Sequence, residues 1–107
     1  MNPERNNTWD LHRHSLQWLE PLVRLWAVEG DRACGALVWN VIDDWERHNG
    51  REPGRSEFAW DDHATANRLR MLVWVWEIYR RQPEFEPRAA VRLLEMIRRH
   101  AVWIDRL

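Results

Sequence analysis

The chain has 107 residues and a mass of 13.1 kDa, with 45% hydrophobic and 31% charged residues. This length and balance are typical of one globular domain or part of one, and they exclude a disordered chain. The formal net charge of −1 provides no overall basic surface for nucleic acid. The longest apolar run, residues 71–76, is far shorter than the roughly 20 residues of a membrane-spanning helix. We therefore expect neither nucleic acid nor a membrane as a partner.

The first ten residues, MNPERNNTWD, contain no apolar stretch of the kind found in a secretion signal, so the sequence predicts a cytoplasmic location. Cys34 is the single cysteine, which excludes an internal disulfide bond and a zinc site built from cysteines. The histidines lack metal-ligand spacing, and the segment GREPGRSE lacks the lysine and hydroxyl of a phosphate-binding loop. We expect no metal and no cofactor.

Two residue types are strongly over-represented. All 16 basic residues are arginine, and nine residues are tryptophan. Arginine binds carboxylates through a planar fork and stacks on indole rings, while tryptophan supplies a large apolar face with one hydrogen-bond donor. Together they suit a site for sugars that carry acid groups. The alternative is that the indoles simply fill the core of a small helical protein.

The spacing of apolar residues predicts four helices, separated by segments that contain glycine and proline. The first helix is expected over about residues 9–29, and Gly30 is placed to end it. Pro21 lies inside this pattern, where it removes one backbone donor. We therefore expect this helix to kink or split near Trp18.

The second helix is expected over about residues 31–48, with Asp31 as its N-cap. Gly35 lies on the apolar side of this helix, where the missing side chain permits close contact with another helix. The connection that follows, residues 49–60, is polar and is the longest in the chain. It ends with two aromatic residues, Phe58 and Trp60.

The third helix is expected over about residues 61–81 and the fourth over about residues 87–107. The third is apolar on nearly all sides, which is typical of a helix in the middle of an assembly. The predicted apolar stripe of the fourth consists of Val91, Leu94, Ile97, Ala101 and Ile104. Because two of the three connections are short, the sequence predicts one all-α domain, residues 1–107, made of two antiparallel helix hairpins.

The junction between the long connection and the third helix, residues 58–70 (FAWDDHATANRLR), carries the richest side-chain chemistry. Asp61 and Asp62 are candidate N-caps, and both suit the positive end of the helix dipole. The first amides of a helix have no backbone partner, so this end also favours a bound anion. The junction is therefore the first candidate for a functional site.

Helical spacing places His63, Asn67 and Arg70 on one face of the third helix, where they are suited to contact an acidic sugar. Arg68 and Asp61 share another face, and a contact between them would hold the start of the helix. The alternative is that the carboxylates only cap the helix, while His63 and Arg68 tie the connection to a neighbouring helix.

Residues 39–80 resemble the N-terminal helical domain of the heparinase II/III-like family of polysaccharide lyases. The resemblance is carried by Trp45, the glycine-containing connection, Trp60, and the string DHATANR that opens the third helix. Members of this family combine an incomplete (α/α) toroid with a β-sandwich domain and cleave acidic polysaccharides by β-elimination. The resemblance implies a toroid segment that faces an acidic polysaccharide, with Trp60, His63 and Arg68 lining or bracing the substrate cleft.

The residues that the family uses for catalysis are not matched. The family places an Asn-His pair on a later helix and a catalytic tyrosine further on, but this chain has no Asn-His dipeptide. Tyr79 is its one tyrosine, and it lies among apolar residues of the third helix. We therefore assign no catalytic residue and expect a non-catalytic segment, either facing carbohydrate or acting as a scaffold. Whether the chain is an enzyme stays open.

Two further hypotheses belong to other functional classes. The first is a small protein-interaction module that self-associates through a tryptophan-rich apolar face, since four toroid helices alone leave apolar surface uncovered. We accordingly expect a homo-oligomer, or association with the remainder of a larger lyase-like protein. The second is a small complete enzyme, for which His63 beside Asp61 and Asp62 is the one acid–base candidate.

Overall fold

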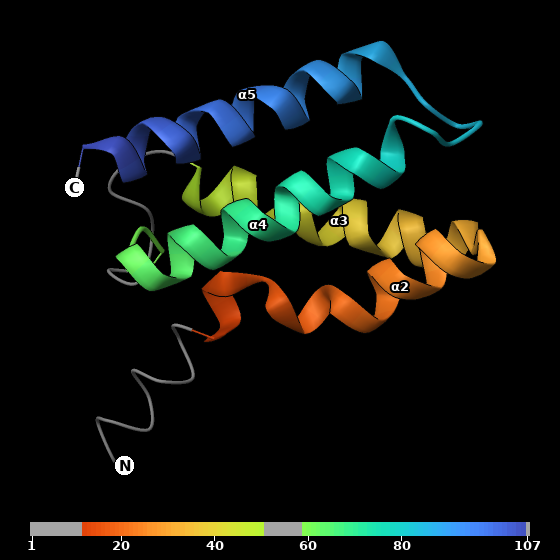
Figure 1. Ribbon diagram of the computed structural model, residues 1–107, viewed down its shortest axis with the longest axis horizontal. Coiled ribbons are helices and arrows are strands. Elements are labelled where there is room, and N and C mark those ends of the chain that lie inside the picture. Colours follow the sequence, from red (N-terminus) through yellow and green to blue (C-terminus); the bar gives the residue numbers. More distant parts are fainter. Residues whose placement is uncertain (1–11, 51–58, 107) are drawn as a thin grey trace.

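The computed structural model describes residues 12–50 and 59–106, and every regular element among them is helical (Figure 1). The elements are the 3-10 helix η1 (Gln17–Leu19) and the helices α2 (Glu20–Glu29), α3 (Arg32–Asn49), α4 (Asp62–Tyr79) and α5 (Pro87–Asp105). The predicted all-α fold with four main helices is therefore confirmed. The expected helix start at residue 9, most of the long connection and residue 107 lie outside the described residues.

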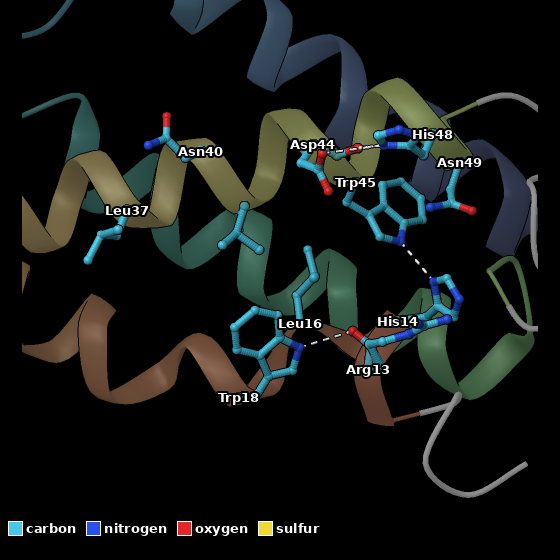
Figure 2. A pocket seen from close by; sticks show the side chains of 11 residues that line it. Arg13, His14, Leu16, Trp18, Leu37, Asn40, Asp44, Trp45, His48 and Asn49 are labelled. Atoms are coloured by element: carbon cyan, nitrogen blue, oxygen red, sulfur yellow. Dashed lines mark hydrogen bonds and ion pairs between the residues drawn. The ribbon is translucent and has the colours of Figure 1, made fainter. Parts of the chain in front are cut away.

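The first predicted helix is split ahead of Pro21, as expected. Residues 12–15 are helical, Leu16 takes a left-handed backbone conformation with a φ of 60°, and η1 leads into α2. Pro21 occupies the first turn of α2, where its missing N–H would have had no helical partner. The indole Nε1 of Trp18 donates to the carbonyl oxygen of Arg13 at 3.0 Å and closes the turn (Figure 2).

The first hairpin joins α2 to α3 through a tight turn with local signals at both ends. Gly30 ends α2 with a φ of 66°, and the Asp31 carboxylate accepts a hydrogen bond from the Cys34 amide at 3.1 Å. Gly35 then faces Trp26 so closely that a Cβ atom would lie 2.7 Å from its indole nitrogen. The predicted close contact at Gly35 is confirmed.

The second hairpin joins α4 to α5, and α4 lies between α5 and the first hairpin (Figure 1). Of the two candidate caps, Asp61 is the N-cap of α4: its carboxylate accepts from the amides of His63 at 2.9 Å and Ala64 at 3.4 Å. Asp62 is the first helical residue instead. Both carboxylates therefore lie at the positive end of the α4 dipole.

The predicted apolar stripe of α5 is wrong in register. Val91 and Leu94 are 66% and 43% exposed. The side of α5 that faces the core carries the buried residues Ala89, Ala90, Leu93, Met96 and His100. Helix α5 has apolar residues on both sides, so spacing alone does not select the buried one. Because His100 is polar, the stripe that is buried in the structure did not stand out as apolar in the sequence.

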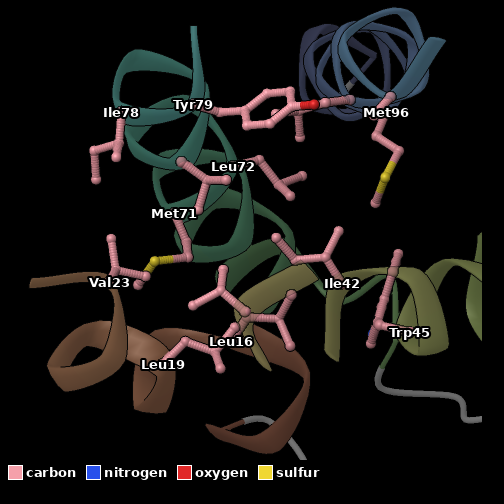
Figure 3. Packing of buried hydrophobic residues seen from close by; sticks show 14 of the residues in the cluster. Leu16, Leu19, Val23, Ile42, Trp45, Met71, Leu72, Ile78, Tyr79 and Met96 are labelled. Carbon is pink, nitrogen blue, oxygen red and sulfur yellow. The ribbon is translucent and has the colours of Figure 1, made fainter. Parts of the chain in front are cut away.

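The hydrophobic core lies between the two hairpins (Figure 3). Leu16 and Leu19 enter it from the turn before α2, Ile42 from α3, Leu72 from α4 and Leu93 from α5, and all are at most 1% exposed. Because α4 contributes buried residues on several sides, it ties both hairpins into one core. This explains why its sequence is apolar nearly all round.

Candidate functional site

The resemblance motif surrounds one buried guanidinium group. Arg68 of α4 has an exposed fraction of 0%. Its Cζ atom lies 3.8 Å from the ring centroid of Trp45 and 5.1 Å from that of Trp60, so the guanidinium packs against two indole faces. Together with His14 and His100, these residues form what we call the Arg68 cluster.

Hydrogen bonds from Arg68 connect three separate parts of the chain. Its Nε donates to Nε2 of His100 on α5 at 2.7 Å, and its Nη1 donates to the carbonyl oxygen of His14 at 2.7 Å. Its Nη2 lies 3.4 Å from the hydroxyl of Thr65, one turn earlier on α4. The His14 ring in turn accepts a hydrogen bond from the indole of Trp45 at 3.0 Å (Figure 2). Arg68 thus joins α4 to α5 and to the segment before η1.

The two ionisable partners hold opposite protonation states at pH 7. Burial lowers the pKa of Arg68 to about 9, so the guanidinium keeps its charge, and Glu46 favours that charge. Burial, and next the charge of Arg68, lower the pKa of His100 to about 3, so its imidazole is neutral. Its Nε2 accepts from Arg68, which leaves Nδ1 to donate to the Met96 carbonyl at 2.7 Å. The tautomer of His100 that carries its proton on Nδ1 therefore satisfies both hydrogen bonds of the ring.

Arg68 is fully buried, so a ligand does not reach its guanidinium. Its hydrogen bonds brace α4 against α5 and the segment before η1. The expected contact between Arg68 and Asp61 is not formed: Arg68 bonds His100 and His14, and Asp61 caps α4. The alternative interpretation is that Arg68 ties the long connection to a neighbouring helix. Arg68 does bond the neighbouring helix α5, but it joins α5 to α4, and most of the connection lies outside the described residues. For His63 that interpretation is wrong, since its exposed side chain has no partner among the described residues.

The five predicted substrate-binding residues fall into two groups. Trp60 and Arg68 meet in the buried cluster. His63 and Arg70 are exposed and Asn67 is half-buried on α4, and their side chains form no hydrogen bond or ion pair with any described residue. Trp60 and Arg68 are therefore buried, whereas His63, Asn67 and Arg70 are at least partly accessible on the surface of α4.

A pocket of about 320 Å³ opens beside Trp60, at the end of α5, and we call it the basic pocket. The residues that line it are Gly50, Trp60, Arg98, Arg99, Val102, Trp103 and Arg106. The Trp60 indole donates to the Asn49 carbonyl at 2.7 Å, and the Trp103 indole donates to the Trp60 carbonyl at 3.1 Å. The two rings meet edge to face with centroids 5.6 Å apart, so the aromatic wall is held rigidly.

Three arginines give this pocket its charge. Arg99 forms an ion pair with Glu46 and donates to the Gly50 carbonyl at 2.7 Å, and Arg98 pairs with Glu95. Arg106 has no ion-pair partner among the described residues. The pocket therefore offers an uncommitted guanidinium beside two fixed indole rings, which suits an anionic group carried on a ring.

A larger pocket of about 730 Å³ lies between the turn before α2 and the outer side of α3 (Figure 2), and we call it the α3 pocket. Trp18 and Trp45 are its aromatic lining residues, and Asn40, Asp44 and His48 line it from α3. Trp45 lines this pocket and Trp60 lines the basic pocket, so each pocket borders a different indole of the Arg68 cluster.

Residues 12–50 and 59–106 contain neither a cluster of metal ligands nor a helix that could span a membrane. No three histidine, cysteine, aspartate or glutamate side chains in that part of the chain lie close enough to hold a metal ion. None of its helices has both the length and the apolar content needed to cross a bilayer. A third pocket, of about 410 Å³, is lined by Trp39 of α3 and Tyr79 of α4. The motif residues lie in or beside the first two pockets and on the exposed face of α4.

The sequence analysis missed three residues that build these sites: His14, His100 and Trp103. A signal existed for the last two, since His100 and Trp103 follow Met96 at helical spacing and so share the buried side of α5. No local pattern identifies His14, because its position depends on the left-handed turn at Leu16 and on Arg68, 54 residues away.

Comparison with known proteins identifies the family of the chain. The family model for the heparinase II/III N-terminus matches residues 1–107, which is the full length of the chain. No curated protein and no solved structure gives a significant match. The tryptophans and arginine that carried the resemblance are those that surround or form the buried guanidinium site. The chain belongs to the heparinase II/III N-terminus family.

Proposed function

We propose that this chain is a non-catalytic, carbohydrate-facing segment of a lyase-like protein that acts on acidic polysaccharides. The family match supports the relation to lyases. The observation that carries the carbohydrate-facing role is the basic pocket, where Arg106 lies beside the indole rings of Trp60 and Trp103. A uronate ring has an apolar C–H face that packs on indole, and its carboxylate pairs with a guanidinium.

The Arg68 cluster gives this pocket its rigidity. Trp60 is 8% exposed and packs against the ring of His100, with centroids 4.7 Å apart, while it also lines the pocket. Its backbone carbonyl holds the Trp103 indole. Arg68 therefore acts on a bound sugar only through Trp60, as a positioning residue. A preformed wall lowers the entropic cost of binding a sugar ring.

A non-catalytic role is consistent with the chemistry of the described pocket lining. β-Elimination needs a base near the proton beside the uronate carboxylate and an acid near the leaving oxygen. Arginines stay protonated at neutral pH and indoles do not titrate, so neither type supplies the base. The lining residues of the basic pocket thus bind and orient without abstracting a proton.

The test is a titration of the whole chain with alginate, heparin and hyaluronan, followed by tryptophan fluorescence and by the ultraviolet absorbance of unsaturated uronate. We expect a saturable fluorescence change with at least one polymer, weaker at high salt because the pairing is electrostatic, and no rise in absorbance. In calorimetry, Trp103→Leu should weaken binding about tenfold, since stacked aromatic contacts are worth about 1 kcal/mol or more.

Trp76→Leu is the matched control, because Trp76 is partly buried on α4 beside Phe85 and outside both pockets. It should bind like the parent chain. Absence of any saturable change with all three polymers would contradict the carbohydrate-facing role. A rise in absorbance would contradict the non-catalytic one.

The second candidate function is self-association, and the outer face of α5 favours it. Val91, Leu94 and Val102 are 66%, 43% and 38% exposed on that face. In an antiparallel pair of α5 helices that crosses between residues 96 and 97, Val91 lies opposite Val102 of the second copy. The same pairing sets Glu95 opposite Arg98 of the second copy, so the face is complementary to itself.

Sedimentation equilibrium over a range of concentrations tests this candidate. The parent chain is expected to gain mass with concentration, and Val91→Asp should raise the dimer dissociation constant at least about tenfold, because it buries a charge in an apolar contact. Val28→Asp is the matched control: Val28 is 79% exposed at the end of α2, away from this face. A parent chain that stays monomeric at every concentration would rule self-association out.

A further inference from the structure

We propose that the α3 pocket is a second binding site, separate from the basic pocket, for an uncharged polyhydroxylated ring such as a neutral sugar unit. The first support is its aromatic platform. Trp18 is 43% exposed, yet its indole is fixed by the 3.0 Å hydrogen bond to the Arg13 carbonyl (Figure 2). An exposed ring held in one orientation offers a flat apolar face to a ligand without losing side-chain entropy on binding.

The second support is the polar wall that α3 contributes. Asn40, Asp44 and His48 are four residues apart in succession, so they follow one side of the helix along the pocket. All three are exposed. The Asp44 carboxylate is 3.4 Å from Nδ1 of His48, which orients both groups (Figure 2). This wall supplies an amide, a carboxylate and an imidazole, which accept and donate hydrogen bonds as sugar hydroxyls require.

The floor of the pocket is apolar. Leu16 and Trp45 are 1% and 6% exposed, and Val41 is half-buried. An apolar floor below a polar wall matches the two sides of a pyranose ring, whose C–H faces are apolar and whose rim carries hydroxyls. A purely apolar ligand would leave the α3 wall without hydrogen-bond partners.

The charge of the lining points to an uncharged ligand. The lining residues with formal charge are one arginine, Arg13, and one aspartate, Asp44, whereas those of the basic pocket are three arginines. At about 730 Å³ the α3 pocket falls within the usual size range of small-molecule sites, roughly 300–1,000 Å³. The two pockets therefore differ in the charged groups that they present to a ligand.

Isothermal titration calorimetry of the whole chain with cellohexaose and with maltohexaose tests this site. The parent chain should bind at least one of these neutral oligosaccharides saturably, with an affinity that high salt leaves unchanged. Trp18→Leu, which keeps apolar volume but removes the flat ring, should weaken binding about tenfold or more. Asn40→Ala should weaken it about threefold to tenfold, as expected for the loss of one neutral hydrogen bond.

Two control variants lie outside the pocket, and one of them is next to Trp18 in the sequence. Gln17→Ala changes an exposed polar residue next to Trp18, and Trp76→Leu removes a partly buried indole elsewhere. Both should bind the neutral oligosaccharide like the parent. The proposal is overturned if the parent binds neither oligosaccharide, or if Trp18→Leu and Asn40→Ala bind like the parent. If Arg106→Gln weakens binding of the neutral oligosaccharide while Trp18→Leu and Asn40→Ala do not, the neutral sugar binds in the basic pocket. That result would also overturn the proposal.

Discussion

Replacing Arg68 with alanine is expected to lower the free energy of unfolding by about 3 kcal/mol or more. The variant leaves Nε2 of His100 and the His14 carbonyl as buried acceptors without a donor, at about 1–3 kcal/mol each. It also opens a cavity between the rings of Trp45 and Trp60. For a domain of this size, the melting temperature should fall by about 10–20 °C. Thermal unfolding followed by circular dichroism measures it.

Arg70→Ala is the matched control, because Arg70 lies on the same helix and is exposed. Its unfolding free energy should change by at most about 0.5 kcal/mol. Arg68→Met combined with His100→Leu should recover part of the stability, since it fills the space with apolar atoms and removes the buried charge together with its principal acceptor. Equal melting of Arg68→Ala and Arg70→Ala would contradict the bracing role.

Acid is expected to destabilise the chain through His100. In the unfolded chain this histidine titrates near its ordinary pKa of 6.5, whereas burial and Arg68 lower its pKa to about 3 in the fold. Below pH 6.5 the unfolded state takes up a proton that the native state does not, so stability falls as the pH falls from 6.5 towards 3. Between pH 7 and pH 4 this histidine should contribute a loss of about 3 kcal/mol.

Urea unfolding at a series of pH values measures this loss, and His100→Gln isolates it. Glutamine keeps an acceptor for Arg68 but does not titrate. Other groups also weaken the fold in acid; the pKa of Glu95, for example, is lowered by its hydrogen bond to Arg98, so protonating this carboxylate removes a favourable interaction. These contributions remain in the variant and cancel in the comparison. Parallel pH profiles for parent and variant would show that His100 is not the titrating group.

The local features of the fold were predictable from the sequence because their causes lie within a few residues. Asp31 and Asp61 cap their helices, Gly30 ends α2, and the helical pattern breaks ahead of Pro21. Each of these signals depends on the backbone of the same turn. The close contact at Gly35 was also predictable, although its partner Trp26 lies on another helix, because a small residue on an apolar stripe marks close packing.

The functional arrangement was only partly predictable because its contacts are long-range. The resemblance included Arg68, but the burial of Arg68 depends on Trp45, Trp60, His14 and His100, which come from four separate segments. Helical spacing placed Arg68 on a face of α4 without showing what covers that face. The same spacing could not select the buried side of α5, because His100 is tolerated in the core only through its bond to Arg68.

In the proposed arrangement, the motif arginine braces the fold and the basic pocket faces the sugar. The most direct measurement compares the affinity of Arg106→Gln and Arg70→Gln for the acidic polymer that the parent binds, by calorimetry at low salt. Both are exposed arginines, but only Arg106 lines the basic pocket. We predict about a tenfold loss for Arg106→Gln, the value of one charge-assisted contact, and parent-like binding for Arg70→Gln. If only Arg70→Gln loses affinity for the polymer, the sugar binds on the α4 face formed by His63, Asn67 and Arg70. That result would contradict the proposed role of the basic pocket.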